Sequence, residues 1–170
     1  MLSSRLSRRA FLKTTALASG AIAFPWPARA EPNALARAAI ARSPLVYVSP
    51  LKGNGEESTC HGEVWFVPDG GDLLVVTNPE RWRAAAIGKG MDRARLWVGN
   101  FGVWKKAGDA FRKAPTFEAR ASIEKDKGVQ AMALEAFGAK YAKEWDKWGP
   151  RFRDGLASGE RVLIRYSPTT

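Results

Sequence analysis

The densest group of potential ligand-binding side chains lies in one seven-residue segment, Thr77-Asn78-Pro79-Glu80-Arg81-Trp82-Arg83. A hydroxyl and an amide are followed by two guanidinium groups, which form paired hydrogen bonds with phosphate or carboxylate oxygens. Trp82 lies between the two arginines and could supply an aromatic wall. The segment therefore predicts a phosphate site. The plain alternative is a capped helix start with solvated arginines, and spacing alone does not separate the two.

The chain has one histidine and one cysteine, His61 and Cys60, and they are adjacent. Neighbouring side chains of a strand point to opposite faces, so we do not expect these two to share a metal ion or to form a thiolate pair. A single histidine excludes a multi-histidine site, and no metal site is predicted. We expect a buried thiol beside a turn or surface histidine, with an axial-ligand role for His61 as the alternative. No catalytic residue can be assigned.

The phosphate segment is expected between a strand and a helix. Residues 72–77 read Asp-Leu-Leu-Val-Val-Thr, and the lack of polar alternation predicts a strand buried on both faces. The turn Pro68-Asp69-Gly70-Gly71 predicts a hairpin between this strand and one at 63–67. Asn78 is a candidate N-cap with Pro79 at the first helical position, and Gly88 ends the helix. The free N–H groups of such a helix start favour a phosphate.

Hydrophobic periodicity predicts the other elements. Phe117, Ala119, Ala121 and Ile123 share one face of a strand, and an apolar stripe from Val129 to Trp148 is helical until Gly149-Pro150 breaks it. We also expect a helix at 33–42, strands at 45–48, 93–98 and 161–166, a hairpin within 102–114 and a short helix at 151–157. Trp65, Trp97 and Trp104 fall in strand-like segments. They could pack in a barrel core or line the site of a flat aromatic ligand. The predicted strands and helices do not alternate regularly along the chain, which favours an α+β fold with an antiparallel barrel and helical insertions.

Residues 1–30 have the pattern of an export signal. Ser7-Arg8-Arg9-Ala10-Phe11-Leu12-Lys13 precedes a short apolar run that ends in Ala28-Arg29-Ala30. The paired arginines resemble a twin-arginine translocation motif, a route for proteins that fold before export, often around a cofactor. The run is too short for a bilayer core of about 30 Å, which disfavours the alternative of an uncleaved anchor. We expect cleavage near Ala30, the twin-arginine translocase as a partner, a periplasmic location, and one domain over 31–170.

The formal charge of +10 does not indicate nucleic-acid binding. Residues 1–30 hold five of the 27 basic residues and none of the 17 acidic ones, so 22 basic residues remain and the charge of residues 31–170 is +5. No later stretch reaches eighteen apolar residues, so no stable membrane insertion is expected.

Residues 45–100 resemble the flavin-binding split barrels related to pyridoxamine-phosphate oxidase and to the deazaflavin-dependent nitroreductases. The resemblance rests on a V-x-F-type strand at Glu63–Val67, the Asp69-Gly70 turn, an apolar strand that ends in Thr77, and the helix with Arg81-Trp82-Arg83. Residues 93–98 resemble the next barrel strand, and 161–166 resemble the last one. The chain departs from the oxidase pattern in two ways: Arg-Trp-Arg replaces Ser-Arg-Lys, and the loop before the second strand is longer.

The resemblance implies a split barrel that binds FMN or, as the alternative, a deazaflavin (coenzyme F420), with haem as a further alternative. Thr77, Asn78, Arg83 and, less clearly, Arg81 would bind the cofactor phosphate, Trp82 would add an aromatic wall, and Trp65 would face the ring system. It implies an oxidoreductase that transfers hydride to a small-molecule substrate. It also implies a homodimer formed through the strand face that carries Trp97 or Trp65. The alternative is a non-catalytic module that binds a flavin, haem or another small ligand on the same barrel.

Overall fold

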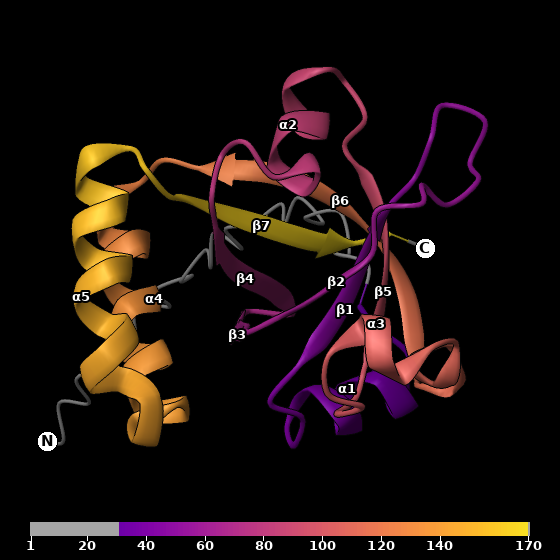
Figure 1. Cartoon of the computed structure of the whole chain (residues 1–170), viewed down its shortest axis with the longest axis horizontal. Coiled ribbons are helices and arrows are strands. Elements are labelled where there is room, and N and C mark those ends of the chain that lie inside the picture. The colour runs from indigo at the N-terminus through magenta and orange to yellow at the C-terminus, as the bar shows by residue number, and fades with distance from the viewer. Residues whose placement is uncertain (1–30, 170) are drawn as a thin grey trace, which may run out of the picture.

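A curled antiparallel sheet of seven strands forms the centre of this computed structural model, which describes residues 31–169 (Figure 1). The strand order is β2-β1-β5-β6-β7-β4-β3. The α+β split barrel expected from the sequence is confirmed. The strands are β1 (Val46–Pro50), β2 (Gly62–Val64), β3 (Val67–Asp69), β4 (Asp72–Thr77), β5 (Arg93–Val98), β6 (Thr116–Glu124) and β7 (Val162–Pro168). The helices are α1 (Ala34–Ile40), α2 (Trp82–Gly88), α3 (Trp104–Ala107), the 3₁₀ helix η1 (Ala110–Lys113), α4 (Lys127–Lys140) and α5 (Ala142–Ser158).

The β3–β4 hairpin forms where the sequence predicts it. Asp69 pairs with Asp72, and the two residues between them, Gly70 and Gly71, have φ values of 55° and 96°. Two successive positive φ angles define a tight hairpin turn of the type that glycine favours. Every residue of β4 is buried, as its unbroken apolar run predicts.

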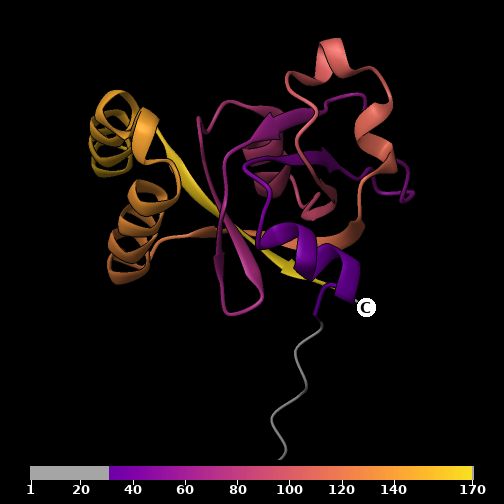
Figure 2. The ribbon, with the colours of Figure 1, turned by 90° about the horizontal axis from the view of Figure 1, so that it is seen from below.

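Strand β4 separates two hydrophobic cores. Leu73 and Val75 point into the barrel, where they pack with β1, β5 and the inner face of β6. Leu74 and Val76 point outward to α4 and α5. These two helices lie side by side against one side of the sheet, and Figure 2 shows them apart from the other helices. Within residues 31–169, no helix combines the length and the apolar character that crossing a bilayer requires.

The helix after β4 begins later than predicted. Helix α2 starts at Trp82, and its N-cap residue Arg81 makes no side-chain capping bond. The Asn78 Oδ1 instead accepts a hydrogen bond of 2.7 Å from the Glu80 N–H, which closes a local turn that competes with the helix. Asn78 is therefore not the helix cap. By contrast, Asn33 caps α1 as its position suggests, since its Oδ1 accepts from the Ala36 N–H at 2.9 Å.

The expected strand at 63–67 is interrupted. Strand β2 ends at Val64 and β3 begins at Val67, and these two strands lie at opposite ends of the strand order. Trp65 and Phe66 therefore carry the chain from one end of the curled sheet to the other, which no local preference specifies. We call the gap between these two sheet ends the seam.

Two further expectations were wrong. Residues 102–114 form α3 and η1 instead of a hairpin. The long helical stripe breaks at Tyr141, whose ψ of 39° leaves the helical range, and α5 continues through Pro150. Phe152 and Leu156, which follow the proline, are buried in the second core, and this burial stabilises a continuous helix.

Candidate ligand-binding cleft

A cleft of about 550 Å³ opens at the seam. It is lined by Leu45, Glu63, Val64, Trp65, Val76, Thr77, Asn78, Arg81, Arg83, Trp148, Phe152 and Arg161. Five of the six residues predicted to bind a cofactor lie in this lining. The sixth, Trp82, does not line the cleft, and the Lys89 ammonium lies 5.0 Å from its ring centre. The cleft falls within the usual size range of small-molecule sites.

The polar side of the cleft carries more positive than negative charge. Arg81, Arg83 and Arg161 line it together with a single carboxylate, Glu63. The Glu63 carboxylate already accepts a hydrogen bond of 3.2 Å from the Trp104 N–H, and Arg161 donates to the Arg151 carbonyl at 3.2 Å. Three guanidinium groups around one carboxylate favour an anionic ligand.

Arg83 is the most distinctive of these cations. Within residues 31–169, its guanidinium makes no hydrogen bond or ion pair, although the side chain is half-buried. Burial lowers the pKa of Arg83 and the nearby Arg81 adds to this shift, while the Glu63 carboxylate opposes it. A cation withdrawn from water without a counter-ion is costly, so an anion that reaches Arg83 gains a strong charge-assisted bond.

The Arg83 guanidinium lies against a glycine of β2. A Cβ at Gly62 of β2 would overlap the Nη2 of Arg83, so the guanidinium occupies space that any other residue would fill. The side chain thus runs from α2 to β2. Thr77, which is 4% exposed at the end of β4, and Asn78 add a hydroxyl and an amide to the same cleft.

The other side of the cleft is aromatic. The Trp65 ring stacks on the Tyr141 ring, with ring centres 4.3 Å apart and an angle of 4° between the planes. Trp148 and Phe152 of α5 pack against Trp65 in T-shaped geometry, with ring centres 6.0 and 6.3 Å from its centre. The Tyr141 hydroxyl bonds to the Phe66 N–H and carbonyl, each at 2.9 Å, which fixes the segment that carries Trp65. A rigid aromatic wall of this kind suits a flat ring system.

Sequence reasoning did not identify Trp148, Phe152 and Arg161 as cleft residues. Trp148 falls in the predicted apolar stripe of a helix, and Arg161 falls at the start of a predicted strand. Arg161 reaches the seam because β7 pairs with β4, which places Val162 opposite Thr77. Trp148 and Phe152 reach it because α5 packs in the second core. No local sequence signal marks that proximity.

His61 and Cys60 are absent from the cleft lining. The Nδ1 of His61 lies 2.9 Å from the Ser49 hydroxyl, and its Nε2 lies 3.4 Å from the Arg112 guanidinium. The expected burial of the thiol was wrong, since Cys60 is exposed. The cleft therefore has no histidine ligand for a haem iron.

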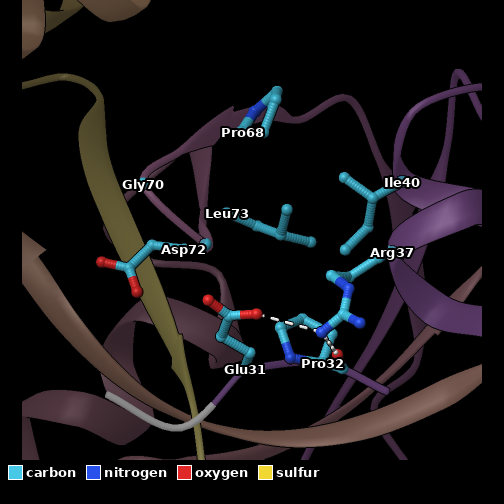
Figure 3. Close-up of a pocket in the computed structure, with 9 residues that line it drawn as sticks. Glu31, Pro32, Arg37, Ile40, Pro68, Gly70, Asp72 and Leu73 are labelled. Atoms are coloured by element: carbon cyan, nitrogen blue, oxygen red, sulfur yellow. Dashed lines mark hydrogen bonds and ion pairs between the residues drawn. The ribbon is translucent and has the colours of Figure 1, made fainter. Parts of the chain in front are cut away.

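A second, smaller pocket of about 250 Å³ lies between α1 and the β3–β4 hairpin (Figure 3). Its one cation, Arg37, pairs with Glu31 at 3.0 Å. The Asp72 carboxylate turns away from this pocket toward β7, where it pairs with Arg165 at 2.8 Å. Because its charges are already paired, this pocket is a weaker candidate than the cleft.

Comparison with known proteins supports the fold. No protein-family model matches the chain, and no curated protein sequence matches it. Among solved structures, a conserved hypothetical protein, Rv2991 of Mycobacterium tuberculosis, matches with a TM-score of 0.57 and 14% identity, over 84% of this chain and 83% of that chain. A candidate pyridoxamine 5'-phosphate oxidase of Listeria innocua matches with a TM-score of 0.52 and 15% identity, over 79% and 91%.

The haem storage protein HutZ of Vibrio cholerae matches with a TM-score of 0.50 and 15% identity, over 83% of this chain and 92% of that chain. All three similarities extend over most of both chains. At such low identity, they show a split barrel like that of the pyridoxamine-phosphate-oxidase-like proteins, and no more than the fold.

Proposed function

We propose that this protein is an oxidoreductase that holds FMN or a deazaflavin in the cleft at the seam. The observation that carries the proposal is the half-buried Arg83 guanidinium, which has no partner among residues 31–169 and lies in a cleft with an aromatic wall. FMN combines a phosphate dianion with a flat ring, so its two ends match the two sides of the cleft.

The residues of the cleft fit distinct tasks in such a protein. Arg83, Arg81, Thr77 and Asn78 would hold the phosphate, and Trp65, supported by Tyr141, would lie against the ring. Trp148 and Phe152 would exclude water from one edge. The bound cofactor supplies hydride transfer, and the protein supplies binding and orientation.

A second candidate is a non-catalytic module that binds a flavin, haem or another small ligand. The similarity to a haem storage protein favours this reading at the level of the fold. The lack of histidine in the cleft lining favours a flavin over an iron-ligated haem at this site. The absorption spectrum of the purified protein separates the candidates, because flavin, deazaflavin and haem have different bands. A colourless protein that takes up none of the three would overturn both.

The sharper test replaces Arg83 with alanine. A hydrogen bond to a charged group contributes about 1.5–3 kcal/mol, so Arg83→Ala should weaken FMN binding by about ten- to a hundredfold. Wild type should prefer FMN to riboflavin, its phosphate-free analogue, and Arg83→Ala should lose most of that preference. Fluorescence titration with both flavins measures the two affinities.

Two variants serve as comparisons for this test. Arg120→Ala should leave FMN affinity unchanged, because Arg120 pairs with Asp92 and does not line the cleft. Thr77→Val should have a smaller effect than Arg83→Ala, since it removes one neutral hydroxyl. Equal binding of FMN and riboflavin by wild type and by Arg83→Ala would show that the cleft does not bind the phosphate.

We further propose that the protein is exported to the periplasm and forms a homodimer. The export signal, residues 1–30, lies outside the described residues. Of the two tryptophans expected at a dimer face, Trp97 is 4% exposed and is covered by Phe111 and Arg112 within the same chain. Trp65 is partly exposed and so is the better candidate for that face.

A further inference from the structure

The residues Trp65 and Phe66 cross the seam without strand pairing of their own. The ladder of β2 ends at Val64, and that of β3 begins at Val67. The Phe66 N–H donates to the Tyr141 hydroxyl at 2.9 Å, and this hydroxyl lies 2.9 Å from two carbonyl oxygens, those of Phe66 and Pro44. The position of the crossing therefore depends on side chains of the α4–α5 junction.

The Tyr141 hydroxyl cannot serve both carbonyls. It has one hydrogen, so it donates fully to only one of them. A second donor is present for Phe66, because the Nζ of Lys140, the last residue of α4, donates to the Phe66 carbonyl at 3.0 Å. The Tyr141 hydrogen is then available to the Pro44 carbonyl. With both donors in place, the hydroxyl ties the crossing to the residue before Leu45, which lines the cleft.

Lys140 has no carboxylate partner in the part of the chain that the structure describes. Its Nζ instead lies 3.3 Å from the centre of the Phe66 ring. The residue as a whole is exposed, yet desolvation of the ammonium lowers the pKa of Lys140 to about 8. A lysine ammonium normally stays in water, so one that is held on a carbonyl and an aromatic face fastens the residue that it contacts.

These contacts determine where the aromatic wall of the cleft lies. Trp65 directly precedes Phe66 in the chain, and its ring stacks on the ring of Tyr141. Lys140 does not line the cleft. It can therefore affect a ring bound there only through the residues that it holds.

We infer that Lys140 is a positioning residue: its hydrogen bond to the Phe66 carbonyl frees the Tyr141 hydroxyl for Pro44 and thereby holds Trp65 in place as the wall for a flat ring. The inference rests on the proposed function for the identity of that ring, a flavin. The positioning itself rests on the hydrogen bonds at Phe66 and Pro44.

The test replaces Lys140 with methionine, which keeps an unbranched chain and removes the ammonium. We expect the affinities for FMN and riboflavin to fall by the same factor, about three- to tenfold, because the two flavins share the ring. Arg83→Ala should instead lower mainly the affinity for FMN. Fluorescence titration at pH 7, where the ammonium is charged, measures both affinities. Lys140→Arg should restore them, because a guanidinium also donates to a carbonyl and stacks on an aromatic ring.

A spectroscopic comparison tests the position of Trp65 without a ligand. The near-ultraviolet circular dichroism of tryptophan depends on how its ring packs against other rings. Lys140→Met should change this signal in the wild-type background and change it much less in a Trp65→Leu background. A lysine that only added stability would lower the melting temperature on its removal and leave the spectrum of the folded protein unchanged.

Two other variants isolate the cause. Lys143→Met is the matched control: Lys143 borders the same hollow at the α4–α5 junction and makes no hydrogen bond among residues 31–169, so both affinities should stay unchanged. Tyr141→Phe keeps the stacked ring and removes the hydroxyl. Combined with Lys140→Met, it should lower the affinities by less than the product of the two separate effects, because both side chains act on the same carbonyl.

The outcomes separate this inference from the proposed function. If wild type binds both flavins and Lys140→Met keeps both affinities, the inference is wrong and the proposed function stands. If Lys140→Met lowers the affinity for FMN alone, its charge acts on the phosphate, and the inference is again wrong. If wild type binds no flavin, the proposed function is wrong and the circular dichroism alone decides: an unchanged spectrum overturns the positioning role, and a change that depends on Trp65 supports it.

Discussion

His61 shows how the surroundings of one residue determine its protonation. The Arg112 guanidinium can only donate, so the His61 Nε2 accepts and its Nδ1–H points to the Ser49 hydroxyl. Burial lowers the pKa of His61, and the charge of Arg112 lowers it further, while Glu57 and Asp109 oppose the shift. The folded protein therefore prefers the neutral imidazole.

This preference predicts a pH dependence of stability. The unfolded chain takes up a proton at His61 near pH 6.5, whereas the folded chain does so only at lower pH. The stabilisation is therefore fully present above about pH 6.5 and is lost as pH falls through the folded pKa. Urea unfolding at several pH values between about 5 and 7 should show a decline in wild type that is smaller in His61→Gln. Parallel profiles for the two proteins would contradict this.

At the scale of an element, the burial of one side of α5 outweighs the helix-breaking tendency of its proline. Pro150 lies inside this helix, where it cannot donate to the carbonyl four residues earlier. The helix persists because its other side places Phe152 and Leu156 in the second core. The same helix brings Trp148 to the cleft, so the continuity of α5 contributes to the site.

Replacing Pro150 with alanine should stabilise the protein. Proline costs about 3 kcal/mol relative to alanine inside a helix, a difference that already includes the unfolded chain. The free energy of unfolding, measured with urea, should therefore rise by up to about 3 kcal/mol. Pro79→Ala is the matched comparison: this proline precedes α2 outside any helix, so its loss should destabilise the protein slightly. A loss of stability in Pro150→Ala would contradict the account.

On the scale of the whole molecule, the seam gives the cleft its composition. Its residues come from β2, β4, α2, α5 and the segments that precede β1, β3, α2 and β7. The cleft is lined by Val64, which packs against the barrel core, and by Val76 and Phe152 of the second core. A protein whose site needs both cores assembled would suit a route that exports folded chains.

Export by that route is tested by replacing Arg8 and Arg9 together with lysine. Lysine keeps the charge but lacks the planar guanidinium, so a receptor that reads guanidinium geometry should no longer accept the signal. Cell fractionation should then find the uncleaved precursor in the cytoplasm. Unchanged secretion of the double variant would mean that the general secretory route accepts this signal.

Local sequence determined the elements whose cause is local. The glycine turn of the β3–β4 hairpin, the Asn33 cap, the doubly buried β4 and the apolar face of β6 follow from propensity and periodicity. Local signals failed where two local preferences competed, as at Asn78, or where distant burial outweighed a breaker, as at Pro150.

Only the tertiary structure decided what surrounds the segment 77–83. The pairing of β4 with β7 brings Arg161 toward Thr77, and the Trp65–Phe66 crossing adds an aromatic wall to the same cleft. These residues are far apart in the chain, and their proximity depends on the order in which the strands pair. Strand order is set by the burial of whole faces in two cores, a property that no short segment carries.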